Sequence, residues 1–234
     1  MAHQLNHEET FQLVLSMHRL LRTLRPARQT TGDYYDFIPL PGGRLGIAIA
    51  DVADKGMGAA LFMASSRTLL RAYAAETPNA PDQVLQKVNQ RITQDTHGGL
   101  FVTLFYGILD PVIGELIYCN AGHNPPYLLQ TSRAMETLKK TGIPLGIFAE
   151  TAWETRSVSL DPQAMLVLYT DGVTEAAGPN ERSFGERRLQ HAIRQAYGSQ
   201  EPQIVLQSIL SSVDDFRAQT PQSDDIALVI VARR

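Results

Sequence analysis

The segments of this chain that read as strands come in consecutive groups, with helical segments between the groups. Apolar and β-branched runs typical of strands occupy residues 34–40, 45–50, 101–109, 115–120, 127–130, 164–170 and 226–232. Helical patterns occupy residues 58–75, 82–95, 186–197 and 202–217. Because a parallel βαβ sheet alternates strand and helix one by one, this grouping favours layers of the α+β class. We expect residues 34–50 to form a hairpin and residues 101–130 to form a β meander.

The first part of the chain has a pattern of its own. From residue 8 to residue 24, apolar side chains recur at the three- and four-residue steps of an amphipathic helix, at Phe11, Val14, Leu15, Leu21 and Leu24. Pro26 ends the pattern, since proline has no backbone N–H to donate. We therefore predict an N-terminal helix in residues 1–24 and one domain in residues 25–234. The apolar stripe of the helix packs on the core or forms the seam of a homodimer, and the segment serves dimerisation or regulation.

Composition and charge narrow the class of protein. The net charge is -3 and the basic residues are scattered rather than gathered into a stripe, which argues against nucleic acid as a partner. No apolar run reaches the roughly 18 residues that a membrane helix needs, and the polar start of the chain is unlike a signal peptide. We therefore expect a cytoplasmic protein with no membrane partner. Cys119 is the single cysteine, so any metal would be held by oxygen or imidazole ligands.

Aspartates stand at the ends of four expected strands. Asp51 and Asp171 each end a buried apolar run, and Asp33 precedes a strand. The pair Asp224 and Asp225 precedes the last strand. Aspartate is also a common turn and helix-cap residue, which is the alternative for any one position. Where several strand ends meet, however, carboxylates repel one another unless cations hold them, and clusters of oxygen ligands suit Mg²⁺ or Mn²⁺.

Six segments in order carry a family resemblance: TGDYYDFIPLPGGRLGIAIADVADKGMGAALFMA, FVTLFYGILDPVIGELIYCNAGHNPPYLL, TGIPLGIF, LVLYTDGVTEA, FGERRL and SDDIALVIV. They resemble the successive motifs of the SpoIIE/RsbU-type serine/threonine phosphatases, a bacterial branch of the metal-dependent PPM phosphatases. The match runs from about residue 25 to the C-terminus. The resemblance implies a four-layer α-β-β-α sandwich, in which helices flank two antiparallel sheets. It also implies two divalent cations, Mn²⁺ or Mg²⁺, at one end of the sandwich.

The resemblance assigns the site residues position by position. The aspartates of the family's metal motifs, which it implies to be the catalytic ligands, fall on Asp33, Asp51, Asp171 and Asp224. The backbone carbonyl of Val52 is implied to face a metal as well, and Asp225 is the alternative to Asp224. Water activated by such cations would attack a phosphoserine or phosphothreonine ester directly. A nucleophilic side chain is disfavoured, because the chain has no G-x-S-x-G motif.

The resemblance also implies a partner. It points to a phosphorylated STAS-domain protein, an antagonist of an anti-sigma factor, as the substrate in stress or sigma-factor signalling. Three positions depart from the family's motifs, namely Thr31, Ala53 and Asp54. They leave open a catalytically weak scaffold that keeps the fold and binds the same partner without turnover. Hydrolysis of a small phosphate ester by the same metals is a further alternative.

Several polar residues near the motifs have weaker signals. Asp54 is predicted to cap the helix that follows it, with an outer-sphere metal ligand as the alternative. His123 lies in a loop rich in glycine and proline, and we predict a structural role for it. Lys55, Arg44 and Arg67 are candidates for holding a phosphate, and nothing in the sequence selects one of them.

Overall fold

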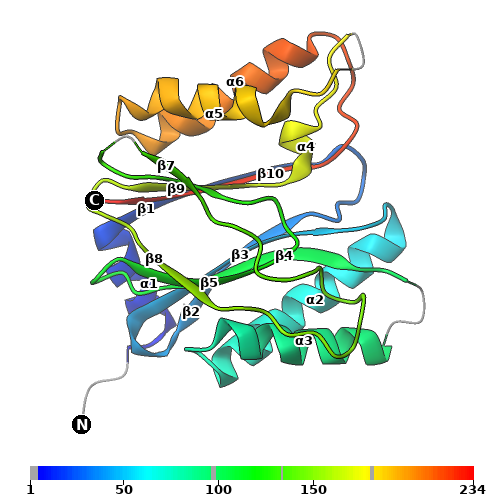
Figure 1. Cartoon of the computed structure of the whole chain (residues 1–234), viewed down its shortest axis with the longest axis vertical. Coiled ribbons are helices and arrows are strands. Elements are labelled where there is room, and N and C mark those ends of the chain that lie inside the picture. Colours follow the sequence, from blue (N-terminus) through cyan, green and yellow to red (C-terminus); the bar gives the residue numbers. More distant parts are fainter. Residues whose placement is uncertain (1–4, 96–98, 133, 180–181) are drawn as a thin grey trace.

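Two antiparallel sheets lie face to face, and helices cover the outer face of each (Figure 1). A computed structural model describes the chain over residues 5–95, 99–132, 134–179 and 182–234. Within these residues each sheet has five strands. This is the α-β-β-α sandwich implied by the sequence, so the fold prediction is confirmed.

The first sheet has the predicted hairpin at its edge. Its order is β2-β3-β4-β5-β8, with the strands β2 (Tyr34–Leu40), β3 (Arg44–Val52), β4 (Val102–Leu109), β5 (Glu115–Ala121) and β8 (Arg156–Ser159). The hairpin turns through the short helix η1 (Pro41–Gly43), where Gly42 and Gly43 have φ angles of 77° and 75°. Such left-handed backbone favours glycine. Helices α2 (Met57–Glu76) and α3 (Pro81–Asp95) cover the outer face of this sheet.

The second sheet contains the first and the last strand of the chain's described residues. Its order is β1-β10-β9-β6-β7, with the strands β1 (His18–Arg25), β10 (Ile226–Arg233), β9 (Met165–Tyr169), β6 (Tyr127–Leu129) and β7 (Met135–Thr137). Helices α5 (Gly185–Tyr197) and α6 (Pro202–Arg217) cover its outer face. The short helix α4 (Asp171–Thr174) follows β9 directly.

The core has a layer between the sheets and a layer under each pair of helices. On β3, Ile47 and Ile49 point between the sheets, whereas Ala48 and Ala50 face the layer under α2 and α3. Successive strand residues point to opposite faces, so a strand covered on both faces is apolar at every position. The continuous apolar run of β3 therefore reflects its place in the middle of the sandwich.

The N-terminal helix is shorter than predicted. Helix α1 (His7–Met17) begins at a capping box, in which the Asn6 and Glu9 side chains each accept a hydrogen bond from the other's backbone N–H. Val14 is fully buried between the sheets, whereas the Leu15 side chain is 42% exposed. The apolar stripe of this helix therefore packs mainly on the core.

Beyond Met17 the predicted helix is wrong, because the chain continues as β1. All eight residues of β1 pair with β10, from His18 opposite Arg233 to Arg25 opposite Ile226. Leu20 and Leu24 point between the sheets. The three-residue step from Leu21 to Leu24 puts both on one face of a helix but on opposite faces of a strand, and here Leu21 packs under α5 and α6 while Leu24 points between the sheets. The predicted boundary after residue 24 consequently falls inside a strand of the second sheet.

The predicted β meander over residues 101–130 is also wrong. Strands β4 and β5 pair in the first sheet, but β6 pairs with β9 and β7 in the second sheet. Residues 122–126, which include two prolines, carry the chain from one sheet to the other. The short strands β7 and β8 and the edge strand β1 were not predicted. No helix of the described residues is long and apolar enough to cross a membrane.

Candidate metal centre

The predicted aspartates gather at one end of the sandwich, the end at which Asp171 begins the short helix α4. In the first sheet, Tyr34 of β2 is paired with Ala50 of β3, which brings Asp33 beside Asp51. In the second sheet, Asp171 follows β9, and Asp224 and Asp225 precede its neighbour β10.

The backbones of the second sheet approach closely beside this cluster. A Cβ atom built on Gly172 would lie 1.8 Å from the carbonyl oxygen of Asp225. Any larger residue at position 172 would therefore push the Asp171 and Asp225 segments apart.

Asp33 is buried and bound by a residue of the other sheet. Its side chain is 3% exposed, and its Oδ2 accepts a hydrogen bond of 2.6 Å from the Thr170 hydroxyl. The same hydroxyl oxygen accepts a 2.9 Å bond from the backbone N–H of Ala227. Thr170 thus ties the Asp33 carboxylate of the first sheet to strands β9 and β10 of the second.

The carboxylates repel one another across the two sheets. Burial, and then the charge of Asp51, raise the pKa of Asp33. Burial, and then the charge of Asp171, raise the pKa of Asp51. Burial, with the charges of Glu175 and Asp224, raises the pKa of Asp171 to about 6. Like charges raise pKa values in this way, and a nearby cation reverses the effect.

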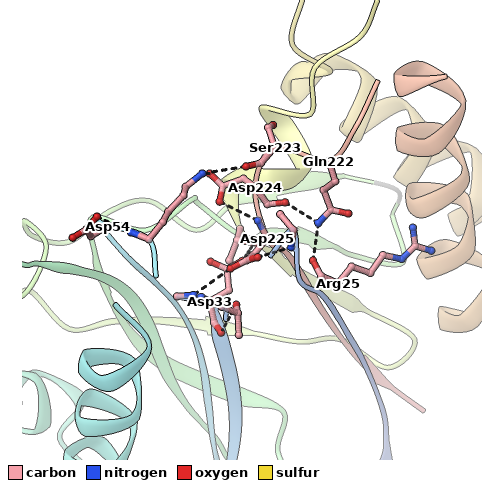
Figure 2. Close-up of polar contacts among 12 residues, drawn as sticks. Arg25, Asp33, Asp54, Gln222, Ser223, Asp224 and Asp225 are labelled. Atoms are coloured by element: carbon pink, nitrogen blue, oxygen red, sulfur yellow. Dashed lines mark hydrogen bonds and ion pairs between the residues drawn. The ribbon is translucent and has the colours of Figure 1, made fainter. Parts of the chain in front are cut away.

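Asp224 and Asp225 are neighbours with different contacts. Asp225 is 8% exposed, and its two oxygens accept hydrogen bonds from the backbone N–H groups of Ala27 at 2.7 Å and Gly32 at 3.1 Å. It therefore fixes the loop that leads into β2. Asp224 is more exposed, and its Oδ2 lies 2.9 Å from the Lys55 ammonium (Figure 2).

The loop between β3 and α2 contains the next two predicted positions. The Val52 carbonyl accepts a 2.9 Å hydrogen bond from the Asp54 N–H, and it lies against Gly32. The predicted cap by Asp54 is wrong, because α2 begins after Gly56 with no side-chain cap. The exposed Asp54 carboxylate instead accepts a 2.7 Å bond from the Lys55 backbone N–H. Its alternative role as an outer-sphere ligand stays a prediction.

His123 lies behind the cluster rather than in it. The ring is fully buried, and its Nδ1 is 2.8 Å from the Thr103 hydroxyl. Thr103 is the β4 residue paired with Asp51, and its hydroxyl donates a 3.4 Å bond to the Asp51 carbonyl. Burial lowers the pKa of His123 to about 3, so the ring is neutral at ordinary pH. These contacts support the structural interpretation of His123.

The donors at this end fit a hard divalent cation in kind. They are carboxylate and carbonyl oxygens, the ligands that Mg²⁺ and Mn²⁺ prefer, and their mutual repulsion is what a cation would relieve. As the side chains stand in the described ranges, no three His, Cys, Asp or Glu residues form a group that could hold a metal ion. The Lys55 ammonium contacts Asp224 instead.

A larger hollow of about 580 Å³ lies elsewhere, between α1, β1, β2 and α2. Its walls include Asp36, which is 4% exposed and accepts hydrogen bonds from Arg67 and Arg71. Burial alone would raise the pKa of Asp36, but the bonds from Arg71 and Arg67 outweigh it and lower the pKa. Arg67, one of the phosphate candidates, therefore serves an internal carboxylate.

The sequence missed several residues that hold this site together. Thr170 lies next to Asp171 in the chain, but its contact with Asp33 spans 137 positions. The contact of Thr103 with His123 spans 20 positions, and that of Asp225 with Ala27 spans 198. The available signal in the sequence is a position next to a motif aspartate, and of these residues it selects Thr170 alone.

Comparisons with known proteins agree with this architecture. The family model described as Stage II sporulation protein E (SpoIIE) matches residues 41–234. Protein IcfG of Synechocystis sp. is 33% identical over 248 residues, an alignment covering 94% of this chain and 38% of that protein. Phosphoserine phosphatase RsbU of Bacillus subtilis is 32% identical over 213 residues, covering 89% of this chain and 61% of that protein. The chain thus spans less than two thirds of either relative.

Solved structures share the fold. The crystal structure of the RsbU and RsbW domains of Rv1364c from Mycobacterium tuberculosis superposes with a TM-score of 0.76 at 26% identity, covering 93% of this chain and 60% of that chain. The SiaA-PP2C domain of Pseudomonas aeruginosa superposes with a TM-score of 0.77 at 21% identity, covering 96% and 89% of the two chains. The sandwich described above is therefore the PP2C-type sandwich.

Proposed function

The chain belongs to the SpoIIE family, and from that premise we propose that it is a metal-dependent protein serine/threonine phosphatase. The observation that carries the proposal is the convergence of five aspartates, from the ends of both sheets, at one end of a PP2C-type sandwich. The raised pKa values of three of them, Asp33, Asp51 and Asp171, indicate an acidic site built for added positive charge. The name of the relative RsbU, a phosphoserine phosphatase, supports the same reaction.

We assign the ligands as the sequence predicted them. The residues that would hold two divalent cations, Mn²⁺ or Mg²⁺, are Asp33, Asp51, Asp171, Asp224 and the Val52 carbonyl. When bound, such cations acidify a water molecule and offset the charge of phosphoryl oxygens. Asp225 is the weaker candidate, because backbone N–H groups already occupy both of its carboxylate oxygens.

Other residues of the chain position these ligands and the substrate. Thr170 fixes the orientation of Asp33 through its 2.6 Å hydrogen bond. Lys55 and Arg28 line the small hollow beside Asp224, where their charges favour an approaching phosphate. Cys119 is fully buried in β5, and burial raises the pKa of its thiol to about 11, which argues against a thiolate nucleophile.

The finer proposals concern the partner and the cell. We propose a phosphorylated STAS-domain antagonist of an anti-sigma factor as the substrate, in partner-switching signalling in the cytoplasm. Homodimerisation through the N-terminal helix stays a proposal. Since Val14 is committed to the core, only the exposed side of α1, with Leu15, is available for such a contact.

The test is phosphate release from p-nitrophenyl phosphate and from a phosphoserine STAS-domain protein. Each substrate is incubated with Mn²⁺, with EDTA, and with the variant Asp171→Asn. Mn²⁺-dependent release from the phosphoprotein, lost in EDTA and in the variant, supports the proposal. Tight phosphoprotein binding without release under any metal condition would leave the scaffold alternative. Release from the small ester alone would point to another substrate.

A further inference from the structure

A lysine spans the mouth of the aspartate cluster. Lys55 lies in the loop between β3 and α2, and its ammonium is 2.9 Å from Asp224 Oδ2 and 3.2 Å from the Ser223 carbonyl (Figure 2). The two partners are 169 and 168 positions away in the sequence. The contact therefore joins the first sheet to the second at the point where Asp224 would bind a cation.

The space beside this contact is small. The hollow lined by Lys55, Asp224 and the loop of residues 27–32 has a free volume of about 10 Å³. That is about the room that one water molecule needs. The Lys55 ammonium thus occupies the position beside Asp224 Oδ2 that a divalent ion would take, and the hollow next to it leaves little room for both.

The ion pair is weak enough to be exchanged. The Lys55 and Asp224 side chains are 44% and 35% exposed, and pairs that solvent reaches contribute little to stability. By contrast, Asp225 is buried and bonded to two backbone N–H groups. A divalent ion interacts with a carboxylate more strongly than a single ammonium at the same distance, so it can replace Lys55 at Asp224.

We propose that Lys55 is an internal competitor of the divalent cation: its ammonium holds Asp224 until the cation displaces it, so Lys55 sets the cation affinity of the site. This inference rests on the proposed metal-dependent function. It makes Lys55 a positioning residue that acts through Asp224, and it concerns cation binding before any substrate is present.

The first test measures Mn²⁺ affinity by calorimetry on the full chain without substrate. Lys55→Gln should bind Mn²⁺ about three- to tenfold more tightly than wild type, because it loses an exposed ion pair and one repelling charge. Lys55→Arg keeps the charge and should stay near wild type. Lys87→Gln is the matched control, because Lys87 makes an exposed 3.0 Å ion pair with Glu76 away from the site.

The outcomes separate the two proposals. If wild type binds Mn²⁺ and Lys55→Gln binds it equally or more weakly, the competitor role is overturned while the metal-dependent function stands. An equal gain in Lys87→Gln would also overturn it, since the effect would then be one of net charge. If wild type binds neither Mn²⁺ nor Mg²⁺, the proposed function fails and this inference fails with it.

A second measurement needs no substitution. Reductive methylation of the wild-type lysines, read by mass spectrometry, should modify Lys55 faster when saturating Mg²⁺ is present, because the cation frees its amine from Asp224. Lys87 supplies the internal reference and should react at the same rate in both conditions. Unchanged labelling of Lys55 at saturating Mg²⁺ would contradict the displacement.

Discussion

Asp33, in the loop that enters strand β2, and Asp36, within β2, are both buried, but their pKa values are shifted in opposite directions. Asp36 lies under the guanidinium groups of Arg67 and Arg71, which lower its pKa. Burial raises the pKa of Asp33, and the charge of Asp51, the main carboxylate that it faces, raises it further. A buried charge is tolerated where the chain supplies its counter-charge, and it is costly where the chain does not.

The comparison separates a structural group from a functional one. The Asp36 cluster is complete within the chain and ties the edge strand β2 to helix α2. Among the described residues, the cluster at the end of the sandwich forms an ion pair with Lys55 alone, although it holds several carboxylates. The deficit of positive charge, rather than burial alone, indicates where an external cation would act.

The largest expected effect on stability comes from removing the charge of Asp36, whose cluster with Arg67 and Arg71 is complete within the chain. Asp36→Asn should lower the free energy of unfolding by roughly 2–4 kcal/mol, since it leaves two guanidinium groups without their buried partner; the range is reduced because both arginines are half-exposed. Urea unfolding at pH 7 measures the loss. The control is Asp95→Asn, whose exposed i,i+4 pair with Arg91 should matter by less than about 0.5 kcal/mol.

The pH dependence of that loss is fixed by the lowered pKa. A carboxyl with a lowered folded-state pKa contributes stability above its ordinary value and loses it as the pH falls through the folded value. Wild type and Asp36→Asn should therefore converge in strong acid. A difference that persists unchanged into acid would show that Asp36 stabilises by packing rather than by charge.

The next largest effect on stability is expected from adding a divalent cation to the aspartate cluster. Mn²⁺ at about a hundred times its dissociation constant should stabilise wild type by about 2.7 kcal/mol over the same protein in EDTA. For a chain of this size, that raises the Tm by roughly 5–10 °C. Thermal unfolding in the two conditions measures it. Asp171→Asn should show little shift, and an equal shift in that variant would place the stabilising ion elsewhere.

The aspartates of the site could be predicted because they end apolar runs that are readable locally. Asp51 follows the buried run of residues 45–50 within β3, Asp171 comes shortly after the fully buried strand β9, and neither strand lies at the edge of its sheet. Strand β1 could not be distinguished from a helix, because apolar side chains on both of its faces, Leu21 under α5 and α6 and Leu24 between the sheets, also stand at a helical step. Strand β6 could not be assigned to a sheet, because its partner β9 lies some forty residues later in the chain.

The positively charged partners of these aspartates could not be predicted from the sequence, for a similar reason. Asp36 stands in a recognised motif, but its role depends on Arg67 and Arg71, which α2 brings back over the sheet from 31 and 35 residues away. Lys55 was one of several candidate cations, and only the meeting of the two sheets selects Asp224 as its partner. Sequence patterns give the ends of the strands, whereas pairing across the sandwich decides which charges meet.

A third buried group, the His18 ring, extends the comparison, because it is buried in its uncharged form. His18 at the start of β1 is fully buried, and neither ring nitrogen has a hydrogen-bond partner among the described residues. Burial, and then the charge of Arg233, lower its pKa to about 4. Between this value and the ordinary 6.5 the unfolded chain binds the proton and the folded chain does not, so stability falls as the pH drops through that window.

Replacing that ring should remove this dependence. Between pH 7 and pH 4, the free energy of unfolding of His18→Leu should fall by about 2 kcal/mol less than that of wild type. This value is set below the one that the full pKa difference of His18 would give. Urea midpoints at several pH values measure it. His191→Leu is the control, since His191 is exposed on α5 and should follow wild type. Identical pH profiles for wild type and His18→Leu would show that water reaches the ring in the folded protein.

The smallest effect tests the incomplete group itself. Asp33→Asn removes one repelling carboxylate and keeps an oxygen for the Thr170 hydroxyl. We expect this variant to be about 1 kcal/mol more stable than wild type in EDTA, since the neutral amide avoids the cost that raises the pKa of Asp33. In Mn²⁺ the order should reverse, because the variant has lost a ligand and wild type gains the ion's stabilisation. Urea unfolding in both conditions decides this, with the exposed Asp161→Asn as the matched control. A loss of stability in EDTA as large as that of Asp36→Asn would mean that Asp33 is held by internal contacts, and the distinction between the two aspartates would fail.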